Sequence, residues 1–460
     1  MNPKERFRLA TRLSTLLVLV FLFVSTAAAE WHEKVLYSFQ GGADGQTPAG
    51  GVIFDKIGNL YGATVDGGAD NCSPMAACGT VFQLEPPANK GEAWTETVLY
   101  VFKGRAFNDG ESPDGGFVMD AAGNLYGTAA YGGTGDCVLL GIKGGCGTVY
   151  EMSPPAQKGG AWTETTLYSF KGGDDGYVPQ GNLVFDSAGN LYGATLFGGG
   201  KGTTCDPYYQ YCGTVFKLSP PKQKGGAWTE KVLHSFAGGS TDGANPNGGL
   251  VLDSTGAIYG TTAAGSNQNC RTAGSVGCGV VFELTPPTKK GGLWAEKQLH
   301  RFDGQDGADP TAGVVFSAKG DLYGTTYFGP TNGYGLIFEL AKPSRKIRSW
   351  AETVLWRFSD GNDGAYPSAG LIFDTQGDLF GTVTGGDTFR GDVFRLTPPK
   401  EKGRVWTLGV LYGFTGSPDG GHPAASLIFD KTGNLYSTTE SGGTGQLCQG
   451  GCGTVFGVSR

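Results

Sequence analysis

The sequence lacks a long hydrophobic segment, has few charged residues and contains only four histidines. The apolar run near its start, 16–24, has about nine residues, far short of the roughly 20 that a membrane-spanning helix needs. Apolar residues show no 3.6-residue period, which excludes a helical solenoid. Only 17% of residues are charged and the formal net charge is −7, so we expect neither nucleic acid nor an anionic membrane as a partner.

Residues 1–29 have the three parts of a secretory signal peptide. A basic start precedes the apolar run, and small residues follow at Ala27, Ala28 and Ala29, which predicts cleavage before Glu30. The alternative, an uncleaved membrane anchor, needs a longer apolar run. The cleavage region has no cysteine to carry a lipid, and the C-terminus has no hydrophobic tail. We therefore expect a secreted or periplasmic/extracellular protein without a membrane span after cleavage, and a monomer.

Glycine and aromatic residues are abundant instead. The 82 glycines and 12% aromatic residues are typical of an all-β protein with many short strands and tight turns. One string of residues occurs seven times, with variations, from Trp31 to the C-terminus. The repeats begin at Trp31, Trp94, Trp162, Trp228, Trp294, Trp350 and Trp406.

Each repeat contains four runs that predict β-strands. The run that opens with tryptophan, such as 94–102, alternates as expected for a strand with two unlike faces. A second run follows a recurrent proline, as in 370–374. An Asp-x-x-Gly-Asn turn, as in 186–190, leads to a Leu-Tyr-Gly-Thr run, and the fourth run, as in 147–150, ends at a Pro-Pro pair.

Four antiparallel strands in each of seven units predict a seven-bladed β-propeller. We name the post-proline run strand A, the innermost, followed by B and C, with the tryptophan run as the outer strand D. On this phase the chain starts with a lone strand D at 31–39 and ends with strands A, B and C, so the first strand completes the last blade. Residues 30–460 are predicted to form one closed domain. A right-handed β-helix is the alternative fold.

The repeats resemble the GloVer tandem repeat, named from Gloeobacter and Verrucomicrobia. The similarity covers nearly everything from Trp31 on. It rests on Pro-x-Gly-Gly-Leu-Ile-Phe-Asp, Gly-Asn-Leu-Tyr-Gly-Thr-Thr and Gly-Gly-x-x-x-Cys-Gly-Thr-Val-Phe, which recur in that order. The resemblance implies export and a β-repeat architecture, but no activity and no catalytic residues. This chain departs from the family in having no recognisable C-terminal sorting anchor.

The ten cysteines form five pairs, each within one repeat and between strands B and C. In an exported protein such pairs predict disulfides, and no histidine lies near them to complete a metal site. The pairs are Cys72 with Cys78, Cys137 with Cys146, Cys205 with Cys212, Cys270 with Cys278, and Cys448 with Cys452.

An Asp-Gly-x-x-Pro motif stands between strands D and A in every repeat. Its carboxylates are candidates for a ring of calcium ligands at the mouth of the channel or for turn caps. Seven identical copies favour the turn cap, so we expect no cofactor, with Ca²⁺ as the alternative. The aspartates are Asp44, Asp109, Asp175, Asp242, Asp306, Asp363 and Asp419.

Function is expected where a repeat differs from the others. Repeats five and six have no cysteine and the shortest B-to-C loops, which predicts a notch in the rim. Aromatic rings beside amide, carboxylate and guanidinium groups suit sugar binding. The predicted lining is Tyr327, Phe328, Asn332, Tyr334, Asp387, Phe389, Arg390 and Asp392. A second aromatic group, Tyr208, Tyr209 and Tyr211, is predicted in the loop of repeat three.

No catalytic constellation stands out. His234 and His300 occupy a slot that is aromatic in the other repeats, and only His422 is expected at the mouth. The sequence therefore favours an exported propeller that binds an extracellular polysaccharide or protein, with no catalytic residues assigned. One alternative is a glycoside hydrolase or polysaccharide lyase that uses carboxylates at the mouth, such as Asp363, Asp387 and Asp392. Another is a purely structural surface repeat.

Overall fold

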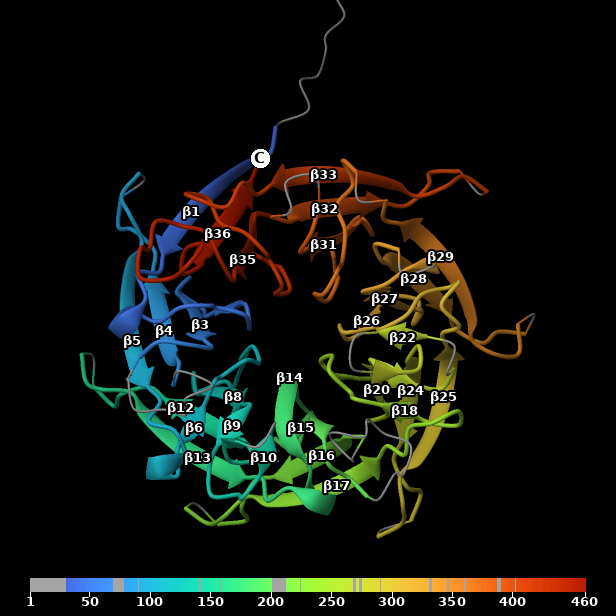
Figure 1. Cartoon of the computed structure of the whole chain (residues 1–460), viewed down its shortest axis with the longest axis horizontal. Helices are drawn as coiled ribbons and strands as arrows, with labels where there is room; N and C mark the ends of the chain where they lie inside the picture. Colours follow the sequence, from blue (N-terminus) through green and yellow to red (C-terminus); the bar gives the residue numbers. More distant parts are fainter. Residues whose placement is uncertain are drawn as a thin grey trace, which may run out of the picture.

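Seven four-stranded antiparallel sheets form a closed ring around a central channel (Figure 1). The structure is a computed structural model. It describes residues 30–68, 78–89, 91–139, 142–157, 159–200, 212–223, 225–267, 270–272, 275–289, 291–330, 333–345, 347–359, 361–386, 390–401 and 403–460. The predicted signal peptide, 1–29, lies outside this range.

Each sheet contains strands A to D in the predicted order from the channel outward. The A strands are β2 (Val52–Phe54), β7 (Val118–Met119), β14 (Tyr177–Phe185), β19 (Val251–Leu252), β26 (Val315–Phe316), β30 (Ile372–Phe373) and β34 (Ile428–Phe429). The B strands are β3 (Leu60–Thr64), β8 (Leu125–Ala129), β15 (Leu191–Phe197), β20 (Ile258–Thr262), β27 (Leu322–Thr326), β31 (Leu379–Val383) and β35 (Leu435–Thr439).

The two outer strands of each sheet are longer on average. The C strands are β4 (Thr80–Glu85), β12 (Thr148–Ser153), β16 (Thr214–Ser219), β24 (Val280–Thr285), β28 (Leu336–Ala341), β32 (Asp392–Thr397) and β36 (Thr454–Ser459). The D strands are β5 (Thr95–Val101), β13 (Thr163–Ser169), β17 (Thr229–Ser235), β25 (Ala295–Arg301), β29 (Ala351–Arg357), β33 (Thr407–Gly413) and β1 (His32–Ser38). We number the blades 1 to 7 by their A strands in chain order.

The ring closes as predicted, because the first strand of the chain completes the last blade. Strand β1 pairs antiparallel with β36 from His32 opposite Ser459 to Ser38 opposite Thr454. The sheet order is therefore β1-β36-β35-β34, with the N-terminal strand outermost beside the C-terminal strand (Figure 1). Closure pairs the outer edge of β36 with β1, so this edge of the last sheet is not left open.

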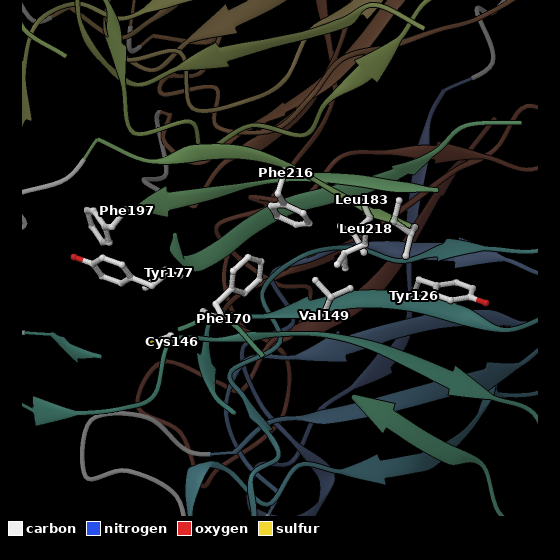
Figure 2. Packing of buried hydrophobic residues seen from close by; sticks show 12 residues of the cluster. Tyr126, Cys146, Val149, Phe170, Tyr177, Leu183, Phe197, Phe216 and Leu218 are labelled. Atoms are coloured by element: carbon white, nitrogen blue, oxygen red, sulfur yellow. The ribbon is translucent and has the colours of Figure 1, made fainter. Parts of the chain in front are cut away.

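The hydrophobic core lies between neighbouring sheets. A phenylalanine that follows strand D packs edge-to-face on an aromatic residue of strand C in the next blade, as Phe170 does on Phe216 with ring centroids 5.1 Å apart. Figure 2 shows this pair between two sheets, with Leu183 and Leu218 beside it. The same contact recurs at all seven blade interfaces.

Two of the repeated glycines are required by close contacts. The glycine of Leu-Tyr-Gly-Thr lies against the strand C aromatic ring: a Cβ on Gly193 would lie 2.6 Å from Cζ of Phe216. The glycine that opens strand C has positive φ and lies against the proline of the next blade: a Cβ on Gly279 would lie 2.7 Å from Cδ of Pro310. The recurring motifs therefore lock one blade to the next.

Candidate binding site at the channel mouth

The chain turns toward the channel through one strained residue in every blade, directly before the proline of Asp-Gly-x-x-Pro. Its φ lies between 55° and 60°, a left-handed conformation that favours glycine and costs other residues about 1–3 kcal/mol. None of the seven is glycine in a chain with 82 glycines. These residues, which we call the mouth ring, are Thr47, Ser112, Val178, Asn245, Asp309, Tyr366 and His422.

Hydrogen bonds hold the mouth ring between two blades. Each backbone N–H donates to the carbonyl of the residue before the strand C glycine in the preceding blade, as Asp309 does to Cys278 at 3.1 Å and Tyr366 to Tyr334 at 2.8 Å. In six blades the ring residue's own carbonyl accepts from the residue after strand B, as from the N–H of Tyr327 to Asp309. The φ angle and the hydrogen bond of the N–H are thus the same in every blade, while the side chain differs.

The acceptor position also separates five blades from two. In blades 7, 1, 2, 3 and 4 it is the second cysteine of each predicted pair, and the structure confirms the disulfides Cys137–Cys146, Cys270–Cys278 and Cys448–Cys452. Cys78 and Cys212 are also disulfide-bonded, and their predicted partners, Cys72 and Cys205, lie outside the described residues. In blades 5 and 6 the position is occupied by Tyr334 and Arg390.

Four aromatic side chains gather where blades 5 and 6 meet. The rings of Tyr327 and Tyr366 stack with centroids 5.1 Å apart and planes 27° apart. Phe328 packs edge-on against Tyr327 at 4.9 Å, and Tyr334 packs edge-on against Tyr366 at 5.6 Å. All four are half-buried. We call them the aromatic cluster.

The structure therefore brings together three of the predicted notch residues, Tyr327, Phe328 and Tyr334, and adds Tyr366, which the sequence analysis did not select. Tyr366 was hidden inside the Asp-Gly-x-x-Pro motif. The signal that could have found it is the variation at the position before the proline, where the seven copies carry seven different residues.

The other predicted notch residues lie elsewhere or outside the described chain. Arg390 lies at the next interface: its carbonyl accepts the N–H of His422, and a Cβ on Gly416 would lie 3.2 Å from its Nε. Asp392 begins β32, where Thr80 and Thr148 begin their strands, and lies under the turn at Gly364. Outside the described residues lie Asn332, Asp387 and Phe389, as do Tyr208, Tyr209 and Tyr211.

The central channel contains a cavity of about 490 Å³ to which all seven blades contribute. The residues after the seven prolines line one level of it. Five of them are polar, in consecutive blades, and the remaining two are alanines. Tyr327 of the aromatic cluster lines the same cavity, which joins the mouth to the channel. The polar and charged lining includes Asp114, Gln180, Asn182, Asn247, Thr311, Ser368, Ser426 and Glu440.

Two carboxyl groups in this cavity lie near each other. Burial raises the pKa of Glu440 to about 7, and the negative charge of Asp114 adds to this effect. Burial also raises the pKa of Asp114, against the hydrogen bond that Gln180 Nε2 donates to its Oδ2 at 2.9 Å. At the mouth, burial raises the pKa of Asp309 to about 6. His422 Nδ1 lies 2.8 Å from Ser441 Oγ.

The seven motif aspartates are bound to the outer strands instead of lining this cavity. Asp175 illustrates the arrangement: its carboxylate accepts from the Tyr168 hydroxyl at 2.7 Å and from the backbone N–H of Lys171 at 2.7 Å. Tyr37, Tyr100 and Tyr412 bond their aspartates in the same way, and His300 and Trp356 take the same place in their blades. These hydrogen bonds agree with the turn-cap interpretation. His300 also packs edge-on against Phe302, as predicted for its aromatic slot.

A second carboxyl group lies beside most of these aspartates. It is the glutamate of Trp-x-Glu in the adjacent blade. Burial, and next the charge of Asp175, raise the pKa of Glu230 to about 8. Burial and the neighbouring aspartate likewise raise the pKa values of Glu33, Glu96 and Glu164 to about 7. Blade 6 differs, since Leu408 stands at this position.

Among the described residues, no group of three or more histidine, cysteine, aspartate or glutamate side chains is arranged to hold a metal ion. In the same part of the chain, no helix is long and apolar enough to cross a membrane.

The fold defines the class of protein as a seven-bladed β-propeller closed by its N-terminal strand. The Gloeobacter/Verrucomicrobia repeat matches the chain over residues 21–203, 137–351 and 270–460, which together reach its C-terminus. The chain belongs to this repeat family.

No curated protein matches the chain. Among solved structures it is similar to a glucose dehydrogenase (14% identity, TM-score 0.43, covering 93% of this chain and 99% of that one). It is also similar to a protein of unknown function from Dyadobacter fermentans (13%, 0.41, 83% and 98%) and to a gluconolactonase from Xanthomonas campestris (13%, 0.36, 68% and 78%). At these identities and scores the likeness says nothing about function.

Proposed function

We propose that this chain is an exported carbohydrate-binding propeller whose binding surface is the aromatic cluster at the channel mouth. The stack of Tyr327 on Tyr366 is the observation that carries the proposal. Half-buried rings present flat apolar faces on which the C–H face of a sugar can stack. The cluster stands where the disulfide-bearing loops of the other blades are replaced, so it is specific to one side of the ring.

The strained backbone at Tyr366 supports the same proposal. A glycine at φ 60° would avoid the cost of the left-handed conformation, yet this position carries a large aromatic side chain. Its N–H is held by the carbonyl of Tyr334 at 2.8 Å, so the ring is placed before a ligand arrives. A preplaced binding surface loses less entropy when it binds.

Export is part of the proposal. The signal-peptide pattern of residues 1–29 and the disulfides Cys137–Cys146, Cys270–Cys278 and Cys448–Cys452 support a compartment outside the cytoplasm. An extracellular protein partner is the alternative ligand.

A panel of plant and microbial polysaccharides tests the proposal, with retention of the protein and release of oligosaccharides scored together. We expect retention without products, and roughly fivefold or greater weakening for Tyr366→Ala and Tyr327→Ala, which each lose about 1 kcal/mol of stacking. Leu293→Ala is the matched control, because Leu293 is a 91% exposed apolar residue in a loop between strands C and D. Equal weakening by the control, or no retention, would contradict the proposal.

The enzyme alternative predicts a different outcome from the same panel. A glycoside hydrolase or polysaccharide lyase would release products, and replacing Asp363, Asp387 or Asp392 would stop their release. Asp363 already accepts from Trp356 Nε1 at 3.1 Å and from the Ser359 hydroxyl at 2.7 Å, so we expect its replacement to disturb the turn first. Repeating the panel with a chelator tests calcium, and we expect unchanged retention.

A further inference from the structure

The channel cavity offers a second site beneath the aromatic cluster. Tyr327 belongs to both, so a ligand seated on the cluster reaches the cavity without crossing another element. The cavity is large enough for part of a sugar chain, since ligand pockets usually measure about 300–1,000 Å³. Its volume is about 490 Å³.

The charge of the cavity has one sign. Its lining contains the carboxyl groups of Asp114 and Glu440 and, within the described part of the chain, no lysine, arginine or histidine. The carboxyl group of Glu440 has no hydrogen-bond or ion-pair partner among the described residues, and its neighbouring charge is the like charge of Asp114. A carboxyl group placed in this way gains from a positively charged ligand, because the ligand offsets both burial and like-charge repulsion.

The position of Glu440 is exceptional within the ring. In the other six blades the equivalent position is occupied by Val65, Ala130, Leu196, Ala263, Tyr327 or Thr384. None of these is charged. Asp114 is equally exceptional, since the other residues after the prolines are uncharged. Blades 2 and 7, which lie on either side of blade 1, therefore each contribute one acidic side chain, while blade 1 contributes the small Ala49 between them.

The arrangement suits an ammonium group better than a divalent cation. Calcium takes six to eight oxygen ligands, usually with several carboxylates. Here there are two carboxyl groups, and Asp114 Oδ2 already accepts from Gln180 at 2.9 Å. An ammonium group needs only three hydrogen-bond acceptors.

We infer that the ligand is an amino sugar polymer, whose sugar face stacks on the aromatic cluster while a primary ammonium group enters the channel and binds Glu440 and Asp114. This inference rests on the proposed function and names its substrate class. It predicts a preference for a sugar chain with free amino groups over the same chain with acetylated ones.

Calorimetric titration with glucosamine oligomers and with N-acetylglucosamine oligomers of equal length tests the inference. In buffer slightly below neutral pH, we expect the amino oligomer to bind roughly tenfold more tightly, the gain from one charge-assisted hydrogen bond. Glu440→Gln and Asp114→Asn should each reduce this ratio toward one and leave binding of the acetylated oligomer unchanged. Glu96→Gln is the control, because the pKa of Glu96 is raised similarly but it does not line the cavity.

The outcomes separate this inference from the proposed function. Equal binding of both oligomers, abolished by Tyr366→Ala, would overturn the inference and keep the proposed function. A ratio that persists in a folded Glu440→Gln variant would also overturn it. Binding of Ca²⁺ that is lost in Glu440→Gln would overturn the inference, because the site would then be a calcium site and not an ammonium site. If neither oligomer binds, the inference fails, and retention on the polysaccharide panel decides separately whether the proposed function holds.

Discussion

The outer parts of the blades and the mouth of the channel differ in how far their residue types repeat from blade to blade. Between the outer strands, the same residue types repeat around the ring: phenylalanine against a strand C aromatic ring, and aspartate capped by an aromatic side chain. In the mouth ring, a backbone with nearly the same φ in every blade carries seven different side chains. Repetition therefore marks what holds the blades together, and variation on a constant backbone marks where the chain can acquire a ligand.

The largest effect should come from the repeated core. Phe216→Ala removes a fully buried ring that packs on Phe170, and we expect the free energy of unfolding to fall by about 3–5 kcal/mol. Tyr366→Ala should cost far less, because Tyr366 is only half-buried while Phe216 is fully buried. Denaturant titration of both variants checks this contrast. Equal losses would contradict the view that the repeated core supports the fold more strongly than the mouth ring does.

The disulfides should matter less to stability, and not to binding. Cys448 and Cys452 close a loop with a sequence separation of 4, for which chain entropy predicts a loss of about 2 kcal/mol when both are replaced by alanine. Retention on the polysaccharide that the parent binds should be unchanged, since the aromatic cluster lies at blades 5 and 6. A loss of retention in a folded variant would contradict the separation of the two regions.

The outer glutamates predict a loss of stability with rising pH. The folded-state pKa of Glu230 is about 8, above the ordinary value of 4.5, so its contribution is complete below about pH 4.5 and is lost as the pH rises toward 8. Glu230→Gln should reduce this loss by about 1 kcal/mol after allowance for solvent screening. Melting temperatures between pH 5 and 9 provide the measurement.

Blade 6 supplies the matched test of that pH dependence. Leu408 stands where the other blades carry this glutamate, beside the Trp356–Asp363 pair. Leu408→Glu should steepen the decline of melting temperature with pH, while Leu408→Gln should leave its slope unchanged. A slope that is insensitive to both Glu230→Gln and Leu408→Glu would show that the outer carboxyl groups are not responsible.

The smallest effect should be a gain. Thr47→Gly removes a β-branched residue from φ 58°, and we expect the free energy of unfolding to rise by up to about 1 kcal/mol. Denaturant titration against the parent checks the sign. A loss of stability would mean that packing of the Thr47 side chain stabilises the fold by more than its positive φ costs.

The sequence predicted the architecture because architecture repeats. Seven copies of one pattern gave the strand order, the closure by β1 and the capping role of residues such as Asp175, since each copy confirmed the others. The cysteine pairs were equally readable, and three of them are confirmed. Tyr327, Phe328 and Tyr334 were found because two repeats visibly lack the cysteines.

The rest of the site depended on contacts that no single repeat contains. Tyr366 and Tyr327 come from successive repeats. Glu440 and Asp114 come from repeats seven and two, whose blades flank blade 1 only when the ring closes. Asp392 was predicted at the rim. It is instead the first residue of strand C, as Thr80 is in blade 1, and it lies under the turn at Gly364. Comparing each position across the seven copies would have shown these differences.

Hydrogen exchange in the presence of a retained polysaccharide tests most directly whether the mouth is the binding surface. We expect added protection of the backbone amides of Tyr327, Phe328, Tyr334 and Tyr366, and none in the loop that carries Leu293 between strands C and D. Protection confined to the outer strands or to that loop would contradict the assignment of function to the channel mouth.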